Sequence, residues 1–342
     1  MEFKSFNEWD ELPESSNTLF AQAEKDSLFF SRHWFENLVT TALEDDQDKL
    51  LACVIEKDIV LAILPLIKRN NKEWTSLHHL YTSLYTLLLV EDKQQDTLTC
   101  LAKGLKQLPF NSLTLEPIAE DDANINNLRQ ALESAGLSCY RYARFFNWFH
   151  QLQGQTFKDY MEARPPKVRN TIARKQRKLE REHNYEIRLH TESDVQQGMA
   201  DFNTVYKASW KATEPFGNVI EGFTNNFSKQ AWTRLAILYI EGQPVAAQLW
   251  FVVHKKASIF KLAYDENWKQ YSLGSILTKY LMEIVIDTDK VEEIDYLTGN
   301  DRYKQDWMSD RRQRWRLVCK HEHKPKIRKN KFTALIKSWL KN

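Results

Sequence analysis

Two stretches of the chain share one pattern of apolar and polar positions. The sequence LLACVIEKDIVLAILPLI at 50–67 aligns without a gap with LAILYIEGQPVAAQLWFV at 235–252. Each pattern predicts a strand, a tight polar turn and a second strand, with the turns at Lys57-Asp58 and Gly242-Gln243. The shared register on both sides of the turn favours an internal duplication over a chance match of apolar alternation.

In the segments around these two hairpins, apolar residues recur with the spacing of either a helix or a strand. Helices are expected at 30–43, 157–182, 194–211 and 274–286, and further strands at 257–264 and 292–297. This order predicts a mixed α/β fold of α+β character, in which largely antiparallel sheets are flanked by helices. The polar sequence QLQGQ at 151–155 marks the boundary between two domains.

Composition narrows the class of protein without naming an activity. The 342 residues are 42% hydrophobic and 27% charged, which indicates a packed core and not a disordered chain. The four cysteines are far apart and none forms a CxxC pair, so we expect no disulfide framework and a reducing, cytoplasmic setting. No secretory signal, spanning helix or metal-ligand spacing is recognisable.

Positive charge is concentrated in two segments. Between Arg164 and Arg181 there are eight Lys or Arg residues against one acid, Glu180. This segment is either a solvated helix face or a surface for an anionic acceptor; nucleic acid is disfavoured because no aromatic residues are interleaved to stack on bases. The tail from Lys324 to Asn342 has seven Lys or Arg, no acid and an apolar face with helical spacing. It is either an interfacial membrane anchor or a terminal helix packed on its own domain.

The polar turn YSLGS at 271–275 joins an expected strand to an expected helix. A helix N-terminus offers unpaired N–H groups and a partial positive charge, so this turn is a candidate phosphate cradle. The alternative is a simple turn, in which Ser272 caps the helix and Gly274 relieves crowding.

The segments RPPKVRNTIARKQRKLERE (164–182), YDENWKQYSLGSI (264–276) and GNDRYKQDW (299–307), in this order, resemble the GNAT acyltransferase superfamily. More narrowly, the chain is similar to the FemAB-like and BioF-like acetyltransferases associated with cellulose or exopolysaccharide biosynthesis. The resemblance implies tandem GNAT-like domains: a degenerate domain at 1–150, a catalytic acyl-CoA-binding domain at 151–320 and a basic amphipathic tail at 321–342.

The resemblance also implies roles for particular residues. Donor binding would fall to Leu262, Ala263, Tyr264, Gln270, Tyr271, Ser272, Leu273, Gly274 and Ser275. The catalytic candidates are Tyr303 as acid and, as base, Asp301 or Asp295, with Asp265 and Glu266 as further carboxylates that could act directly or through water. Lys304 and Trp307 match the family's D-x-Y-K-x-x-W pattern on the acceptor side. Trp148, in the aromatic run RYARFFNWFH, would either line an acceptor groove or belong to a buried strand.

The expected activity is transfer of an acyl group, acetyl from acetyl-CoA, to an amine or hydroxyl of a sugar, polysaccharide or cell-envelope precursor. No metal is required. Two alternatives stay open: a Fem-type ligase that uses aminoacyl-tRNA, and a non-catalytic adaptor in polysaccharide biosynthesis. The expected location is the cytoplasm, with the tail as a means of peripheral association with the inner face of the membrane.

Overall fold

The computed structural model describes residues 1–44, 47–211 and 214–321. Of the tail predicted at 321–342 only His321 is described, so the predicted anchor lies outside the described residues. Among the helices of the described ranges, none combines the length and the apolar character needed to cross a bilayer.

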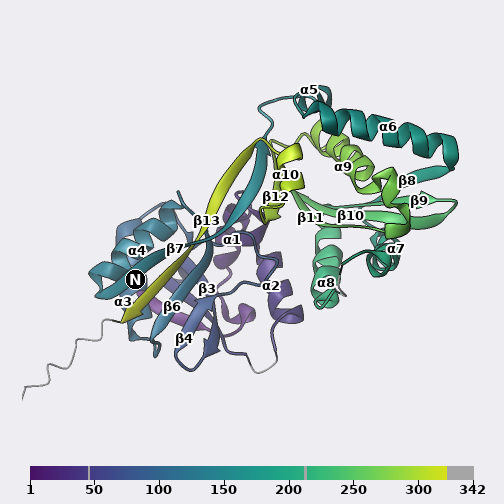
Figure 1. The fold of residues 1–342 in the computed structure, drawn as a ribbon. Coiled ribbons are helices and arrows are strands. Elements are labelled where there is room, and N and C mark those ends of the chain that lie inside the picture. Colours follow the sequence, from purple (N-terminus) through teal and green to yellow (C-terminus); the bar gives the residue numbers. More distant parts are fainter. Residues whose placement is uncertain (45–46, 212–213, 322–342) are drawn as a thin grey trace, which may run out of the picture.

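One mixed sheet runs through the described part of the chain (Figure 1). Its order is β1-β2-β3-β4-β6-β13-β7-β12-β11-β10-β9-β8, and β5 pairs with β3 off this path. Only β4–β6 and β11–β12 pair in parallel, so the sheet is largely antiparallel, as the sequence predicts. The strands are β1 (Glu2–Phe6), β2 (Lys49–Glu56), β3 (Ile59–Asn70), β4 (Glu73–Ser76), β5 (Leu88–Leu89), β6 (Ser112–Ala119), β7 (Leu137–Gln151), β8 (Tyr185–His190), β9 (Thr233–Ile240), β10 (Gln243–Val253), β11 (Lys256–Tyr264), β12 (Glu293–Thr298) and β13 (Asp310–His321).

Helices cover both faces of this sheet, and in the second half α6 and α9 lie on one face of β8–β11 while α7 and α8 lie on the other (Figure 1). The α-helices are α1 (Ser16–Ala23), α2 (Arg32–Thr41), α3 (Gln94–Gln107), α4 (Ala123–Ser134), α5 (Phe157–Glu162), α6 (Pro166–Glu182), α7 (Val195–Ala208), α8 (Gly217–Ser228), α9 (Leu273–Glu283) and α10 (Arg302–Trp307). Shorter helical turns are η1 (Trp9–Glu11), η2 (Leu28–Phe30), η3 (Glu266–Tyr271) and η4 (Ile284–Thr288).

The helix expected at 157–182 is two helices, α5 and α6. Pro165 has an extended backbone (φ −52°, ψ 136°), and α6 begins at Pro166. A proline disfavours helical geometry in the residue before it and is well suited to the first helical turn, so the two consecutive prolines separate the helices. The periodicity on either side of them is helical, which is why the pattern alone suggested one continuous helix.

The two predicted hairpins are present, and their details agree with each other. The turns are Lys57-Asp58 and Glu241-Gly242, and all four residues have positive φ, the geometry of a type I′ turn. Each second strand then carries one extra residue at the same distance from its turn, Leu61 and Val245. The second turn therefore lies one residue earlier than the gapless alignment predicts, because the alignment matched apolar positions and not turn geometry.

The duplication extends to the whole order of elements. The first half reads β1-α1-α2-β2-β3-β4-α3-β6-α4-β7 and the second reads β8-α7-α8-β9-β10-β11-α9-β12-α10-β13, with α5 and α6 between them and the two-residue β5 added in the first. The last strands are exchanged: β13 pairs with β6 of the first half, and β7 pairs with β12 of the second. The two long strands also pair with each other, which joins both halves in one sheet.

Apolar packing joins the halves as well. One hydrophobic core contains the first half together with α7, α8 and the adjacent face of β9–β11. At its centre Trp34 of α2 stacks on Phe223 of α8 with ring centroids 4.0 Å apart, and both side chains are fully buried. A second core fills the space between the opposite face of the second half and α5, α6 and α9.

Cys139 of β7 and Cys319 of β13 lie directly opposite each other and form a disulfide, which corrects the expectation that no disulfide is present. The two cysteines are 180 residues apart in the sequence. Spacing along the chain could not reveal the pair, since the exchange of the two last strands brings them together. Cys53 is buried and Cys100 is partly exposed, and both are free thiols.

Candidate active site

The parallel strands β11 and β12 separate after a short stretch of pairing. In the described structure they pair only at Lys256–Glu293, Ala257–Ile294 and Ser258–Asp295. Beyond that point β11 continues to Tyr264 without pairing to β12, so backbone groups on this edge of β11 are left for another partner.

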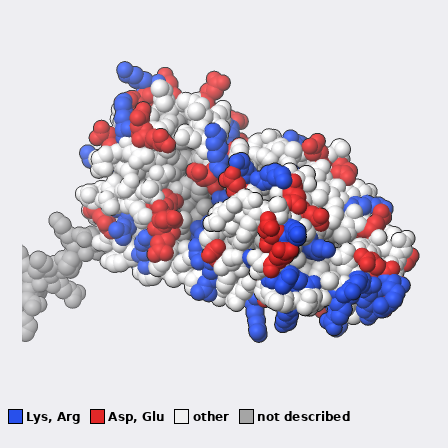
Figure 2. All heavy atoms as spheres, turned by 90° about the horizontal axis from the view of Figure 1, so that it is seen from above, with Lys and Arg blue, Asp and Glu red and all other residues white. Residues whose placement is uncertain are grey.

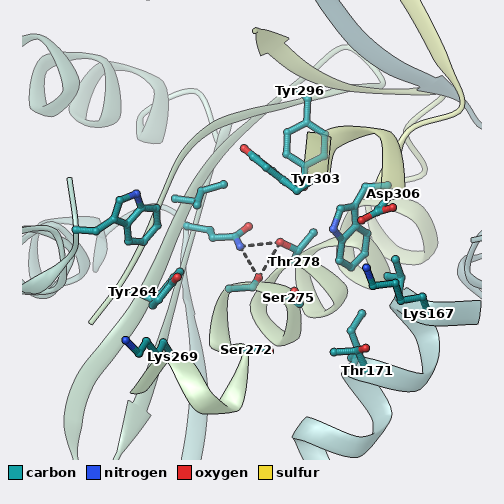
Figure 3. A pocket seen from close by; sticks show the side chains of 17 residues that line it. Lys167, Thr171, Tyr264, Lys269, Ser272, Ser275, Thr278, Tyr296, Tyr303 and Asp306 are labelled. Atoms are coloured by element: carbon teal, nitrogen blue, oxygen red, sulfur yellow. Dashed lines mark hydrogen bonds between the residues drawn. The ribbon is translucent and has the colours of Figure 1, made fainter. Parts of the chain in front are cut away.

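A cavity of about 420 Å³, called the splay cavity below, opens where the strands part (Figure 3). Leu262 and Tyr264 of β11 line one side and Tyr296 of β12 another. The remaining walls come from α6, α9, α10, β10, η3 and the segment after α7, through Lys167, Val168, Thr171, Ile172, Trp210, Gln248, Lys269, Ser272, Gly274, Ser275, Thr278, Tyr303, Asp306 and Trp307.

The N-terminus of α9 faces this cavity. Ser272 precedes the helix in a left-handed conformation (φ 54°) and makes no side-chain cap. The amides of Ser275 and Ile276 bond to the carbonyl of Ser272, whereas among the described residues the amides of Leu273 and Gly274 have no acceptor. Leu273 is fully buried, whereas Gly274 lines the cavity, so a free N–H group at the positive end of the helix is placed to bind an anion there.

Gly274 keeps this helix end open. A Cβ at Gly274 would lie 3.6 Å from the ring of Tyr264, which is ordinary contact, so the position tolerates a side chain but any longer one would enter the cavity. The side chains of Lys167 and Lys269 stand on either side of the turn (Figure 3) and add positive charge to the rim.

Gln248 of β10 holds the first turn of α9 in place. Its Nε2 donates to the Gly274 carbonyl at 2.9 Å and to Thr278 Oγ1 at 2.7 Å (Figure 3). Trp250 Nε1 in turn donates to Gln248 Oε1 at 2.9 Å. The buried amide of Gln248 is therefore satisfied on both sides and fixes the helix end against the sheet.

A second cavity of about 290 Å³, called the lysine cavity below, adjoins the splay cavity. The two share Leu262, Tyr296 and Tyr303 as wall residues. The remaining walls of the lysine cavity are Leu80, Tyr81, Lys211, Ile259, Phe260, Lys261, Leu297, Thr298 and Lys304. Leu80 and Tyr81 belong to the first half of the chain, so this cavity lies where the halves meet.

Tyr303 stands between the two cavities, on α10. Burial, and then the nearby Asp301 carboxylate, raise the pKa of the Tyr303 hydroxyl to about 12. The hydroxyl therefore stays protonated at neutral pH and is a hydrogen-bond donor, although the raised pKa makes it a weaker acid than an ordinary tyrosine. Lys304 beside it donates to the carbonyls of Tyr296 and Thr298, and these bonds tie α10 to the end of β12.

Asp295 lies on the opposite face of β12 from Tyr296 and lines neither cavity. Its carboxylate accepts from Arg312 at 2.6 Å, from Asn147 at 2.5 Å and from the Leu297 amide at 2.6 Å. Burial alone would raise the pKa of Asp295, but Arg312 and the neighbouring Arg314 lower it below its ordinary value. Its contacts join β12 to β7 and β13 and give it a structural role.

The residues expected from the sequence are partly brought together. Seven line the splay cavity: Leu262, Tyr264, Ser272, Gly274, Ser275, Tyr303 and Trp307; Lys304 lines the lysine cavity. Seven line neither: Ala263, Gln270, Tyr271, Leu273, Asp295, Asp301 and Trp148.

Several of the residues outside the cavities have evident structural contacts. Tyr271 is buried against α6, where its hydroxyl donates to Glu182 at 2.9 Å. Asp301 is an exposed residue 3.5 Å from Lys304, and Trp148 Nε1 donates to Asn300 at 2.8 Å.

Sequence reasoning missed Gln248, Thr278, Tyr296, Asp306 and Lys211 as cavity residues. Gln248 is a single polar residue within an otherwise apolar strand pattern, and that was the signal that could have found it. In the described ranges no cluster of three or more His, Cys, Asp or Glu side chains could hold a metal ion.

Comparison with known proteins agrees with this geometry. Residues 166–305 match the family model of the acetyltransferase (GNAT) domain. No curated protein sequence matches the chain.

Among solved structures the chain is similar to FemX, with a TM-score of 0.64 at 7% identity over 92% of this chain and 96% of that one. It is similar to a conserved protein of unknown function from Bacteroides thetaiotaomicron, with a TM-score of 0.59 at 11% identity over 93% and 99% of the two chains. It is also similar to the C-terminal domain of a putative lysylphosphatidylglycerol synthetase from Agrobacterium fabrum, with a TM-score of 0.54 at 13% identity over 83% and 86%. Identities this low concern the fold alone. Residues 166–305 therefore match the GNAT acetyltransferase domain and include the strands and helix around the splay cavity, and this match indicates that the protein is an acyltransferase.

Proposed function

We propose that the protein is an acyl-CoA-dependent N- or O-acyltransferase that uses acetyl-CoA and acts on a sugar, polysaccharide or cell-envelope precursor. The observation that carries the proposal is the free amide of Gly274 at the N-terminus of α9, in the wall of a cavity beside the edge of β11 that β12 leaves. The resemblance to FemAB-like and BioF-like enzymes supports the acceptor class.

The chemical groups of an acyl-CoA donor match the walls of the splay cavity. A pantetheine arm carries amide groups that can bond, in the way an added strand would, to the edge of β11 that β12 leaves, at groups other than the Leu262 carbonyl, which accepts from Lys211. A diphosphate carries the negative charge that the α9 N-terminus, Lys167 and Lys269 attract. An apolar wall of Leu262, Val168 and Ile172 suits the thioester end, because water there would compete with the acceptor.

The reaction requires few groups. The acceptor nitrogen or oxygen attacks the thioester carbonyl, a C–N or C–O bond forms, the C–S bond breaks, and CoA leaves as a thiolate. Tyr303 borders both cavities, so its hydroxyl can hydrogen-bond to that thiolate and pass it a proton while taking one from water, which leaves Tyr303 protonated. The proton of the acceptor passes to Asp306, the one carboxylate that lines the splay cavity in the described structure, or to water.

A second candidate is an aminoacyl-tRNA-dependent ligase, and the position of α6 favours it. Arg164 is buried and donates to the Trp307 carbonyl at 2.7 Å, but the other seven Lys and Arg residues of this segment are exposed or partly exposed. Figure 2 shows Lys and Arg side chains gathered at the end of the molecule where α6 lies. Lys175 also donates to the Gln270 carbonyl, so this cationic helix borders the splay cavity and could receive a phosphate backbone there.

A thermal-shift screen separates these functions. A CoA thioester at about 100 times its dissociation constant should stabilise the protein by about 2.7 kcal/mol, which is a visible rise in melting temperature. Transfer of labelled acetyl from acetyl-CoA to glucosamine-containing acceptors then tests the activity. If no CoA thioester raises the melting temperature and aminoacyl-tRNA binds with strong salt dependence, the ligase is correct; if neither donor binds, the protein acts as an adaptor.

A further inference from the structure

The lysine cavity holds three ammonium groups and no carboxylate. Lys211, Lys261 and Lys304 all line it, and no Asp or Glu is among its wall residues in the described part of the chain. Its volume of about 290 Å³ is at the lower end of the range for small-molecule sites, so it accommodates a single sugar or amino-acid unit.

Two of these cations are already paired. Lys261 lies 2.6 Å from the Glu214 carboxylate and over the ring of Tyr81 at 3.9 Å. Lys304 is bound by two carbonyl oxygens and lies 3.5 Å from Asp301. Their charges are therefore balanced by groups outside the cavity walls.

Lys211 is not balanced in this way. Its Nζ donates to the Leu262 carbonyl and lies 5.6 Å from the ring centre of Tyr206 and 5.5 Å from that of Trp210. Among the described residues no carboxylate comes within ion-pair distance of it. Burial, and then repulsion from Lys261, lower the pKa of Lys211 to about 8; the more distant carboxylates of Glu214 and Asp301 raise it only in part, and Lys304 lowers it further. A cation held in a partly buried site without a counter-ion is stabilised by any anion that enters.

The position of Lys211 relative to the proposed site of the thioester is also defined. Leu262, whose carbonyl accepts from Lys211, belongs to the strand that borders both cavities. A molecule in the lysine cavity would reach the thioester across the shared wall at Tyr303. Such a molecule would be the acceptor and not part of the donor.

We propose that the lysine cavity binds the acyl acceptor and that this acceptor carries an acidic group, a phosphate or a carboxylate, which pairs with Lys211. The role as acceptor site rests on the proposed acyltransferase function. The preference for an acid does not, because it follows from the charge of the cavity. Nearby lysines also lower the pKa of an amine bound among them, so the acceptor nitrogen loses its proton more readily.

Three amino sugars that share one amine test the preference directly. Glucosamine 6-phosphate carries a phosphate, muramic acid carries a carboxylate, and glucosamine carries neither. Isothermal titration of the full chain without any donor should give affinities at least about tenfold higher for one of the acids than for glucosamine, the factor expected for one charged hydrogen-bonded pair. The two acids also show whether phosphate or carboxylate is the better partner.

The variant Lys211→Met should bind the acids no better than glucosamine, and Lys211→Arg should keep the preference. Lys207→Met is the matched control, because Lys207 is an exposed residue at the end of the preceding helix, α7, and should change nothing. If neither acid binds more tightly than glucosamine to the wild-type chain, the inference is wrong, whether or not any variant folds. The same conclusion holds if Lys211→Met folds and keeps the preference. Acid-selective binding without acetyl transfer would leave the cavity assignment standing and reject the proposed donor.

Discussion

Replacing Gly274 by glutamate tests the donor site at its centre. The residue occupies the first turn of α9, where its own amide is free and its Cβ would meet Tyr264 at an ordinary 3.6 Å. The new side chain therefore has room at its base and extends into the splay cavity. Its carboxylate would compete for the site at which we place the diphosphate.

The size of the effect follows from the charges involved. Two unit charges about 4 Å apart interact by about 4 kcal/mol at an effective dielectric constant near 20, which corresponds to roughly a thousandfold loss in affinity. The substitution should not destabilise the fold. A carboxylate in the first turn of a helix is favourable by about 0.3–1 kcal/mol, and removing a glycine from a helix adds about 0.5–1 kcal/mol.

Isothermal titration with acetyl-CoA measures the loss, and the melting temperature of the unliganded variant reports the fold. Gly274→Ala is the matched control: its methyl group fits against Tyr264, so acetyl-CoA affinity should change little while the melting temperature rises. If Gly274→Glu melts like the wild type and binds acetyl-CoA with unchanged affinity, the amides of α9 do not hold the donor and the assignment of the splay cavity is wrong.

Four other outcomes are expected. Tyr303→Phe should lower kcat about a hundredfold at unchanged KM for the acyl-CoA, because only proton donation to the thiolate is lost. The affinity of the acidic acceptor should fall above pH 8, as Lys211, whose pKa is about 8, loses its charge, and Lys211→Met should show no such fall. Asp295→Asn should destabilise the chain by about 3 kcal/mol. Because the pKa of Asp295 is lowered in the folded state, the stabilising effect of its carboxylate is present above about pH 4 and is lost on acidification. The free energy of unfolding of the variant, measured by urea denaturation, should therefore depend less on pH below about pH 4 than that of the wild type. Thiol alkylation should label Cys53 and Cys100 on unfolding but Cys139 and Cys319 only after reduction.

The parts of the fold that local pattern controls were accessible from the sequence. Apolar alternation around a two-residue polar turn is sufficient to specify a hairpin, and both hairpins are present. The exact residue of a turn is set by backbone geometry and not by hydrophobicity, so Glu241-Gly242 was placed one residue late. The exchange of β7 and β13 is invisible to any local pattern, and the Cys139–Cys319 disulfide depends on that exchange.

The residues of the candidate site also divide into those that local sequence predicts and those that only the tertiary structure reveals. The YSLGS turn and Tyr303 lie in segments with recognisable local chemistry, and Ser272, Gly274 and Tyr303 do face the splay cavity. Gln248 and Lys211 come from segments whose pattern is that of core strand or amphipathic helix, and only the tertiary arrangement shows that their polar atoms point into the site. Asp295 illustrates the opposite error, in which a residue predicted to be catalytic has a structural role. Its carboxylate pairs with Arg312 on the face of β12 away from the cavities.

The exchanged strands connect the first half of the chain to the splay cavity of the second half. β12 must leave β11 for the splay cavity to exist, and a strand that leaves one neighbour needs pairing on its other side. That neighbour is β7, the last strand of the first half, which β13 and β6 hold in turn. Residues 151–321 alone would lack β7 and, with it, Asn147, one of the partners that fix Asp295, and they would lack Tyr81 in the wall of the lysine cavity. Under the proposed function, the first half would therefore support donor binding through the sheet and contribute to acceptor binding through the wall of the lysine cavity, so the whole chain would be the active unit.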